Sequence, residues 1–428
     1  MRIAVIGSGI SGLGCAHALH KDAHVSLYEA ESRLGGHTNT VDVTLDNLTY
    51  PVDTGFLVLN ERTYPNLIRL LAELGVPTAR SDMSFAVSVN LGWRRLEWSG
   101  TDLNGVFAQR RNLVSPRFLA MLRDILRFNE HATRIALGQE AVESRLSLGE
   151  FLERNGYGSP FRNWYLLPMA AAIWSSPIAT MLSYPVATFV RFCHNHGLLQ
   201  VNDRPQWYTV RGGARQYVRR IAASLHEVRT SDPVQEVRRD AASGRVVVRS
   251  RSGSALYDHV VLACHSDQAH RLLVDADPLE RSVIGNVQFQ PNRALLHTDA
   301  RLMPESRRVW SAWNYMSDGN AEPQVSVTYL LNKLQPLPFS TPLFISLNPS
   351  IEPRADTVMA EFDYTHPVFD ARAIEAQRRL PGVQGRRGVW FAGAWTGYGF
   401  HEDGLKSGLA VAAAIQRQAE TIRERRVA

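Results

Sequence analysis

The stretch Met1-Arg-Ile-Ala-Val-Ile-Gly-Ser-Gly-Ile-Ser-Gly12 decides the fold of this chain. Residues 2–6 form a short, mostly apolar run that predicts a buried parallel strand. Glycines at positions 7, 9 and 12 follow directly, and residues 13–19 predict a helix. A strand, Gly-x-Gly-x-x-Gly and a helix in this order form the dinucleotide-binding fingerprint. The phosphates would lie at the helix N-terminus, where free N–H groups and the helix dipole favour anions.

An acidic residue completes this expected site. Residues 24–28 predict a second strand, and Glu29 follows it directly. A carboxylate at this distance from the glycines accepts hydrogen bonds from a ribose. The alternative is an ordinary glycine turn, but the sequence favours a dinucleotide site. Its contacts would come from Gly7, Ser8, Gly9, Ile10, Ser11, Gly12 and Glu29.

Length and composition are typical of a globular protein with more than one domain. The chain has 428 residues, of which 45% are hydrophobic and 21% are charged. No apolar run reaches the roughly 18 residues that span a bilayer, and we expect no signal peptide. The three cysteines are far apart, so we expect no disulfide framework and no metal site, and a cytoplasmic location.

The net charge of +6 comes almost entirely from arginine, because lysine occurs only at positions 21, 333 and 406. Genomic base composition is one explanation. Attraction to anionic lipid head groups at the inner face of a membrane is another. No basic run interleaved with aromatic residues is present, so nucleic acid is not an expected partner.

The next segment indicates which dinucleotide the site binds. The stretch Ala30-Glu-Ser-Arg33-Leu-Gly35-Gly36-His37 follows the ribose acid. It resembles the flavin amine oxidase and phytoene desaturase superfamily, whose members carry an acid, an arginine and Gly-Gly at this spacing and bind FAD. His37 stands where many members have arginine. The resemblance implies FAD contacts from Ala30, Arg33, Gly35, Gly36 and His37.

The resemblance extends to three remote segments. In the superfamily a loop corresponding to Asp53-Thr-Gly55-Phe56 passes beside the flavin ring, although Asp53 could also be a plain turn residue. Val234 stands at the position that contacts adenine in relatives. Residues 258–264 resemble the strand that ends beside the cofactor, at Ala263.

The closing segment is the stretch Phe391-Ala-Gly393-Ala394-Trp395 through Gly397-Tyr398-Gly-Phe-His401-Glu402-Asp-Gly-Leu405-Lys-Ser-Gly408, before an expected helix at 409–415. The superfamily closes its FAD site with this layout. It implies cofactor contacts from Gly393, Ala394, His401, Glu402 and Leu405, with Ala394 in place of a frequent acid. No cysteine lies near this loop, so the FAD is expected to be non-covalent. We expect His401 to face the flavin as a proton acceptor or orienting group, with Trp395 and Tyr398 as pocket walls.

These patterns together predict an α/β fold, with a Rossmann-like FAD-binding domain of the amine oxidase type and an inserted α+β substrate domain. The FAD-binding domain would comprise residues 1–78, 205–272 and 383–428. The substrate domain would comprise a largely helical part at 79–204 and an antiparallel sheet at 273–382.

The expected substrate domain contains the most apolar stretch in the chain, at residues 161–177 and 186–192. Its neighbour at residues 116–137 predicts an amphipathic helix with four arginines. That helix belongs either to the cap itself or to a face that lies on a membrane. A cap this apolar suggests an apolar substrate.

Other polar residues have open roles. His265 follows the strand that ends beside the cofactor. His366 and Asp370 lie in Phe362-Asp-Tyr-Thr-His366-Pro-Val-Phe-Asp370, where they either line a site or fix a turn, and a turn is favoured.

Three functions follow from the resemblance. The first is an FAD-dependent, desaturase-like dehydrogenation of an apolar substrate such as a fatty acyl chain of membrane lipid. This chain resembles a bacterial branch of FAD-binding oxidoreductases met beside enzymes of the cyclopropane fatty acid synthase type. The second is an amine oxidase that produces hydrogen peroxide. The third is a flavoprotein with a binding or redox-sensing role.

Overall fold

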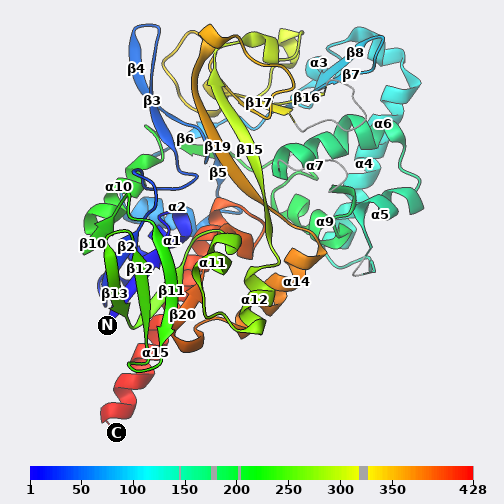
Figure 1. Cartoon of the computed structure of the whole chain (residues 1–428). Coiled ribbons are helices and arrows are strands. Elements are labelled where there is room, and N and C mark those ends of the chain that lie inside the picture. The colour runs from blue at the N-terminus through cyan, green and yellow to red at the C-terminus, as the bar shows by residue number, and fades with distance from the viewer. Residues whose placement is uncertain (144–145, 175–180, 201–203, 318–325, 428) are drawn as a thin grey trace.

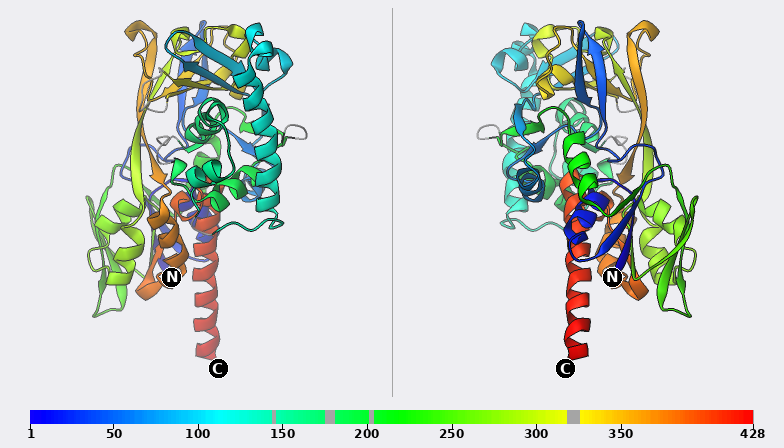
Figure 2. Two further views of the ribbon diagram at one scale, coloured as in Figure 1. Left: turned by 90° about the vertical axis from the view of Figure 1, so that its right-hand side faces the viewer. Right: turned by 90° about the vertical axis from the view of Figure 1, so that its left-hand side faces the viewer.

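The computed structural model describes residues 1–143, 146–174, 181–200, 204–317 and 326–427 (Figure 1). The expected α/β fold is confirmed, with one parallel sheet and one large, mostly antiparallel sheet. In the described part of the chain, no helix is both long and apolar enough to cross a membrane. The C-terminal part of the last helix extends beyond the body of the molecule (Figures 1 and 2).

The parallel sheet carries the first strand at its centre. Ile6 pairs with Tyr28 on one side and with Leu262 on the other. Val5, Leu27 and Val261 are fully buried, as the sequence pattern of a doubly covered strand predicts. In spatial order the strands are β10 (Glu227–Arg229), β2 (His24–Tyr28), β1 (Arg2–Ile6), β14 (His259–Leu262) and β20 (Val389–Phe391).

Two apolar layers cover this sheet. Helices α1 (Ile10–Leu19), α2 (Pro65–Glu73), α10 (Arg215–Ser224) and α15 (His401–Val427) share a core with one face. The opposite face packs against an antiparallel sheet and helices α11 (Ser266–Leu272), α12 (Pro278–Ile284) and α14 (Ala371–Arg379). That antiparallel sheet consists of β11 (Val234–Asp240), β12 (Arg245–Ser250) and β13 (Gly253–Tyr257).

The large sheet is built from two remote parts of the sequence, joined where β16 pairs in parallel with β7. Its other strand pairs are antiparallel. In spatial order it comprises β19 (Val358–Val368), β15 (Gln288–His297), β18 (Phe344–Leu347), β17 (Ser326–Leu330), β16 (Trp313–Ser317), β7 (Phe85–Asn90) and β8 (Arg95–Ser99). The sequence also predicts a strand at residues 325–330; it is observed from Ser326, and residue 325 lies outside the described residues.

Helices cover one end of this sheet (Figure 1). They are α3 (Leu103–Val106), α4 (Pro116–Ala136), α5 (Leu148–Arg154), α6 (Ser159–Phe161), α7 (Leu167–Trp174) and α9 (Val186–Asn195). A π-helical turn, Arg162–Leu166, joins α6 to α7. The apolar stretch expected at 161–177 is described as far as Trp174, and the rest of it lies outside the described residues.

Small sheets connect the two large ones. β3 (Thr40–Leu45) and β4 (Leu48–Asp53) form a hairpin, and β9 (Trp207–Val210) pairs with β5 (Leu59–Asn60) and β6 (Thr78–Ser81). Helix α13 (Leu331–Leu334) follows β17 directly. In this region Gln335 makes two hydrogen bonds to the Asp53 backbone, with its Nε2 donating to the carbonyl oxygen and its Oε1 accepting from the N–H.

Two expectations for the C-terminal third were wrong. The last helix begins at His401 rather than at residue 409, because the Asp403 carboxylate accepts the N–H groups of Tyr398 and Phe400 and ends the loop there. His366 does not fix a turn, since it lies within strand β19. Asp370 accepts the Ala373 N–H and begins helix α14.

Candidate functional site

Two glycines of the first loop are required by packing. Gly7 has a φ of +105°, and a Cβ there would lie 2.6 Å from the Ala263 carbonyl oxygen. A Cβ on Gly12 would lie 1.9 Å from the Gly7 carbonyl oxygen. The loop, the first strand and helix α1 therefore approach more closely than any other residue type allows.

Gly9 differs from both, because a Cβ there would meet no atom within 4 Å. Within the described residues, the N–H groups of Gly9 and Ile10 donate no hydrogen bond. They lie at the N-terminus of α1, where such free donors and the helix dipole attract an anion. The open space beside Gly9 is therefore a cradle that suits a pyrophosphate.

Ser8 joins the expected ribose acid to the second glycine pair. Its Oγ donates to Glu29 Oε2 at 2.5 Å and accepts from the Gly35 N–H at 3.0 Å. Arg33 donates to the Gly36 carbonyl oxygen at 2.8 Å, and a Cβ on Gly36 would lie 3.2 Å from Gly9 Cα. The structure thus brings Glu29, Gly35 and Gly36 around Gly9.

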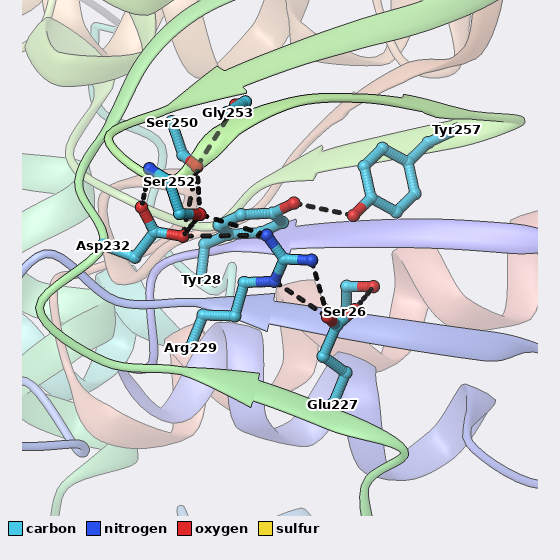
Figure 3. A network of polar contacts seen from close by, with 9 residues as sticks. All are labelled: Ser26, Tyr28, Glu227, Arg229, Asp232, Ser250, Ser252, Gly253 and Tyr257. Carbon is cyan, nitrogen blue, oxygen red and sulfur yellow. Dashed lines mark hydrogen bonds and ion pairs between the residues drawn. The ribbon is translucent and has the colours of Figure 1, made fainter.

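A polar network joins Tyr28, at the end of β2, to residues 227–232 and 250–253 (Figure 3). Arg229 donates to Glu227 at 2.6 Å, and its guanidinium lies 5.1 Å from the centre of the Tyr28 ring. Asp232 accepts from the backbone N–H of Ser252 at 2.9 Å, and its own N–H donates to the Glu29 carbonyl oxygen. These contacts join β2, β10 and the β12–β13 turn. Val234 begins β11 and packs with the core between the parallel sheet and the antiparallel sheet β11–β13.

Four histidines lie near one another and near the start of α15: His37, His265, His366 and His401. Burial is the main cause that lowers the pKa of each of them, to about 4 for His366, to about 3 for His401, and well below the ordinary value for His37. His265 shifts in the same direction. The other three histidines each lower the pKa of His37 further. All four rings are therefore neutral at pH 7, and the site carries N–H donors and acceptors without imidazolium charge.

A hydrogen-bond relay fixes the tautomer of His366. The Arg293 N–H donates to Asn348 Oδ1 at 2.9 Å, which leaves the Asn348 amide nitrogen to donate to Asn292 Oδ1 at 2.8 Å. The Asn292 amide nitrogen must then donate to His366 Nδ1, at 3.0 Å. The ring proton of His366 is therefore on Nε2.

His366 lies beside His37, with 5.3 Å between the ring centres. His37 Nε2 is buried and has no hydrogen-bond partner within the described residues, and the ring stacks on Tyr364. A ligand group or a water molecule beside this buried nitrogen would supply the hydrogen bond that it lacks. Gly55 approaches the same residue, because a Cβ there would lie 2.3 Å from the His37 carbonyl oxygen.

His401 is held by residues of the core that the helices α1, α2, α10 and α15 share with the parallel sheet. Its ring stacks on Phe56 with 3.8 Å between centres, and its Nε2 lies 2.7 Å from the Tyr217 hydroxyl. That hydroxyl also bonds Thr38. The ring is thus oriented through both a face and an edge, as a group that holds or moves a proton must be.

Glu402 has a structural task rather than a free side chain. Its carboxylate accepts the N–H groups of Asn66 and Leu67 at 2.9 and 3.0 Å, and the Asn66 amide at 2.6 Å, at the N-terminus of α2. Leu405 also packs inward, since a Cβ on Gly14 of α1 would lie 2.4 Å from its Cδ1. Both side chains fix α15 to its neighbours.

The loop before α15 separates its two aromatic candidates. Tyr398 and Phe400 contact Phe192 of α9, with ring centres 5.8 and 5.0 Å away. Trp395 is not with them: it is 2% exposed in the core on the opposite face of the parallel sheet, and its Nε1 donates to the Cys264 carbonyl oxygen. The expectation that Trp395 lines the pocket was therefore wrong.

Four relevant residues were missed by sequence reasoning. The Ser407 hydroxyl accepts the Gly393 N–H at 2.9 Å, just before Ala394. Tyr217 and Asn292 act through contacts across the fold, which no local pattern reveals. Phe400 had a usable indication, because it lies between Tyr398 and His401 in the closing motif.

The residues present fit FAD. Gly9, Ile10 and Gly36 offer the pyrophosphate cradle, Glu29 lies where a ribose would bind, and His37 has an unpartnered buried nitrogen. The N-terminus of α15 at His401 supplies a second positive helix end. Among the described residues, no group of His, Cys, Asp or Glu side chains is arranged to hold a metal ion.

Comparisons with known proteins agree with this geometry. The model of the flavin containing amine oxidoreductase family matches residues 10–311. The chain resembles the structure of a conjugated-linoleic-acid-producing fatty acid isomerase from P. acnes, at 15% identity and a TM-score of 0.67, over 97% of this chain and 98% of that one. It also resembles putrescine oxidase bound to putrescine, at 15% identity and a TM-score of 0.70, over 97% and 99%.

A third similar structure is cyclohexylamine oxidase from Brevibacterium oxydans, at 17% identity and a TM-score of 0.69, over 98% of this chain and 99% of that one. At such identities the likeness shows the fold alone. No curated protein sequence matches the chain significantly.

Proposed function

Because the chain belongs to the flavin-containing amine oxidoreductase family and is an FAD-dependent oxidoreductase, we propose that it dehydrogenates an apolar substrate in a desaturase-like reaction. The substrate class that we favour is a fatty acyl chain of membrane lipid. Bound FAD supplies two-electron redox chemistry, and the protein must bind, orient and desolvate the substrate beside it.

The apolar wall beside the closing loop carries this proposal. Tyr398 and Phe400 contact a core that the cap helices α4, α5, α7 and α9 share. Phe192 of this core contacts both rings, and a Cβ on Gly399 would lie 3.0 Å from the ring of Phe369, another member of the core. A polar substrate that moved from water to these residues would lose its hydrogen bonds, whereas a hydrocarbon chain has none to lose. The apolar surroundings therefore favour a hydrocarbon chain.

The neutral histidines supply hydrogen-bonding groups for such a reaction. A neutral His401 offers Nε2 as a hydrogen-bond acceptor to the Tyr217 hydroxyl when its ring proton is on Nδ1. His366 donates through Nε2–H and cannot accept at that nitrogen. The two rings therefore offer one hydrogen-bond acceptor and one hydrogen-bond donor while both stay uncharged.

Three of the similar structures bear on the substrate. One acts on a fatty acid, which supports an acyl chain as a ligand for this fold. The amine alternative is supported by the putrescine and cyclohexylamine oxidases and by the aromatic pair Tyr398 and Phe400, which could contact a cation. Lys333, the one lysine in the sequence between residues 273 and 382, pairs with Asp82 at 3.2 Å.

Anaerobic mixing of the flavin-loaded protein with defined substrates tests the proposal. Bleaching of the flavin by phospholipids or free fatty acids, but not by putrescine, is the expected result. Bleaching by amines alone, with peroxide release in air, would replace it with the amine oxidase. A flavin that stays oxidised with both classes would favour the binding or redox-sensing role.

A further inference from the structure

A surface on the cap, far from the parallel sheet, combines exposed apolar side chains with arginines. Trp93, Leu103 and Val114 are 78%, 75% and 81% exposed, whereas side chains of these types are usually covered. The cap-tip surface, as we call it, comprises Trp93, Leu103, Leu113, Val114 and Leu119 with Arg110, Arg111 and Arg117.

These residues come from adjoining turns rather than from a groove. Trp93 lies at the tip of the β7–β8 hairpin, Leu103 begins α3, and Val114 ends the 3-10 helix η1 (Arg110–Val114). Figure 1 shows α3, β7 and β8 grouped at one end of the cap. The Arg111 guanidinium donates to the Arg95 carbonyl oxygen at 3.0 Å, which ties η1 to the hairpin.

The cap-tip surface carries positive charge that its arginines do not share with a carboxylate in an ion pair among the described residues. Arg110 donates to Asn104 at 3.1 Å, and Arg117 lies over the Trp164 ring. Among the described residues, Arg110, Arg111 and Arg117 form no ion pair with a carboxylate. One acid, Asp102, adjoins Leu103, and its Oδ1 accepts the Gly105 N–H at 2.7 Å.

We propose that the cap-tip surface docks on an anionic lipid bilayer. Tryptophan prefers the interface between head groups and acyl chains, while leucine and valine reach the apolar layer below. The three arginines match anionic head groups. Protruding side chains around a basic set suit a deformable bilayer better than a protein partner, which would need a complementary concave surface. The inference does not depend on the reaction that the flavin supports.

Sedimentation of the flavin-loaded protein with vesicles tests the inference. We expect binding to vesicles of phosphatidylcholine mixed with phosphatidylglycerol, and little binding to phosphatidylcholine alone. Replacing both Trp93→Ser and Val114→Ser should weaken binding at least about tenfold. Replacing both Arg110→Gln and Arg117→Gln should weaken it by roughly fivefold per arginine, and less in high salt.

Val274→Ser is the matched control, because Val274 is 51% exposed but lies outside the cap-tip surface. It should bind vesicles like the unaltered protein. The flavin absorbance spectrum and thermal midpoint of each variant show that the fold is retained. Equal binding by all variants would overturn the proposal, as would no vesicle binding at all. A loss of self-association in the Trp93 and Val114 variant, without a change in vesicle binding, would assign the surface to a second copy of the chain instead.

Discussion

Replacing Gly9 by alanine separates cofactor binding from folding. Gly9 has a φ of −62° and a ψ of 173°, which alanine adopts without strain, and a Cβ there would meet no protein atom within 4 Å. The substitution should therefore leave the free energy of unfolding unchanged or raise it by roughly 0.4–1 kcal/mol, because the unfolded chain loses freedom. Any loss that the substitution causes must then be a loss of ligand binding.

The expected harm is to FAD affinity. The new methyl group would occupy the space in which the Gly9 and Ile10 N–H groups meet the pyrophosphate. Losing one charge-assisted hydrogen bond costs roughly 1.5–3 kcal/mol, which corresponds to a ten- to hundredfold weaker affinity.

Gly12→Ala is the contrasting substitution. Its Cβ would lie 1.9 Å from the Gly7 carbonyl oxygen, so the first strand and α1 must move apart. We expect a loss of about 3 kcal/mol in the free energy of unfolding.

Two measurements check the pair: urea unfolding of the apoprotein, and titration of FAD by quenching of its fluorescence. Gly9→Ala should weaken FAD binding without lowering the free energy of unfolding, whereas Gly12→Ala should lower the free energy of unfolding. If Gly9→Ala binds FAD as tightly as the unaltered chain, the pyrophosphate does not lie beside Gly9 and the cofactor assignment is refuted.

Three further predictions concern the groups around the start of α15 and the relay. Glu402→Ala should lower the free energy of unfolding by about 3 kcal/mol in urea titrations, because three donors lose a buried acceptor. Glu420→Ala, an exposed change on the same helix, should stay within about 0.5 kcal/mol, and equal losses would contradict the capping role. Asn292→Leu should release His366 from its Nε2–H tautomer, so nitrogen NMR should show mixed tautomers; an unchanged single tautomer would contradict the relay. Burial raises the pKa of Asp403 to about 6, above its ordinary 3.8, so the protonated form stabilises the fold at low pH and this contribution is lost as the pH rises through 6. The free energy of unfolding of Asp403→Asn minus that of the unaltered chain should therefore grow by up to about 2 kcal/mol between about pH 4 and pH 8, and a difference independent of pH would refute it.

The sequence by itself determined the loop geometry that we assign to the adenine-side half of the cofactor site. Gly7, Gly9, Gly12 and Glu29 lie within about thirty residues, and each acts through local geometry: a turn, an open backbone or the end of a strand. Apolar periodicity likewise located the first strand and α4 at their observed positions. Such patterns report which face of its own element a residue occupies, so they carry this information without knowledge of the rest of the chain.

Only the tertiary structure decided the roles at the other end. Glu402 caps a helix more than 330 positions away, and Asn292 fixes the tautomer of His366 from a neighbouring strand. Trp395, three residues before Tyr398, lies on the opposite face of the parallel sheet. A side chain's hydrogen-bond partners depend on which elements pack against its own. That choice is made by the burial of whole apolar faces, and not by the few residues around the side chain in sequence.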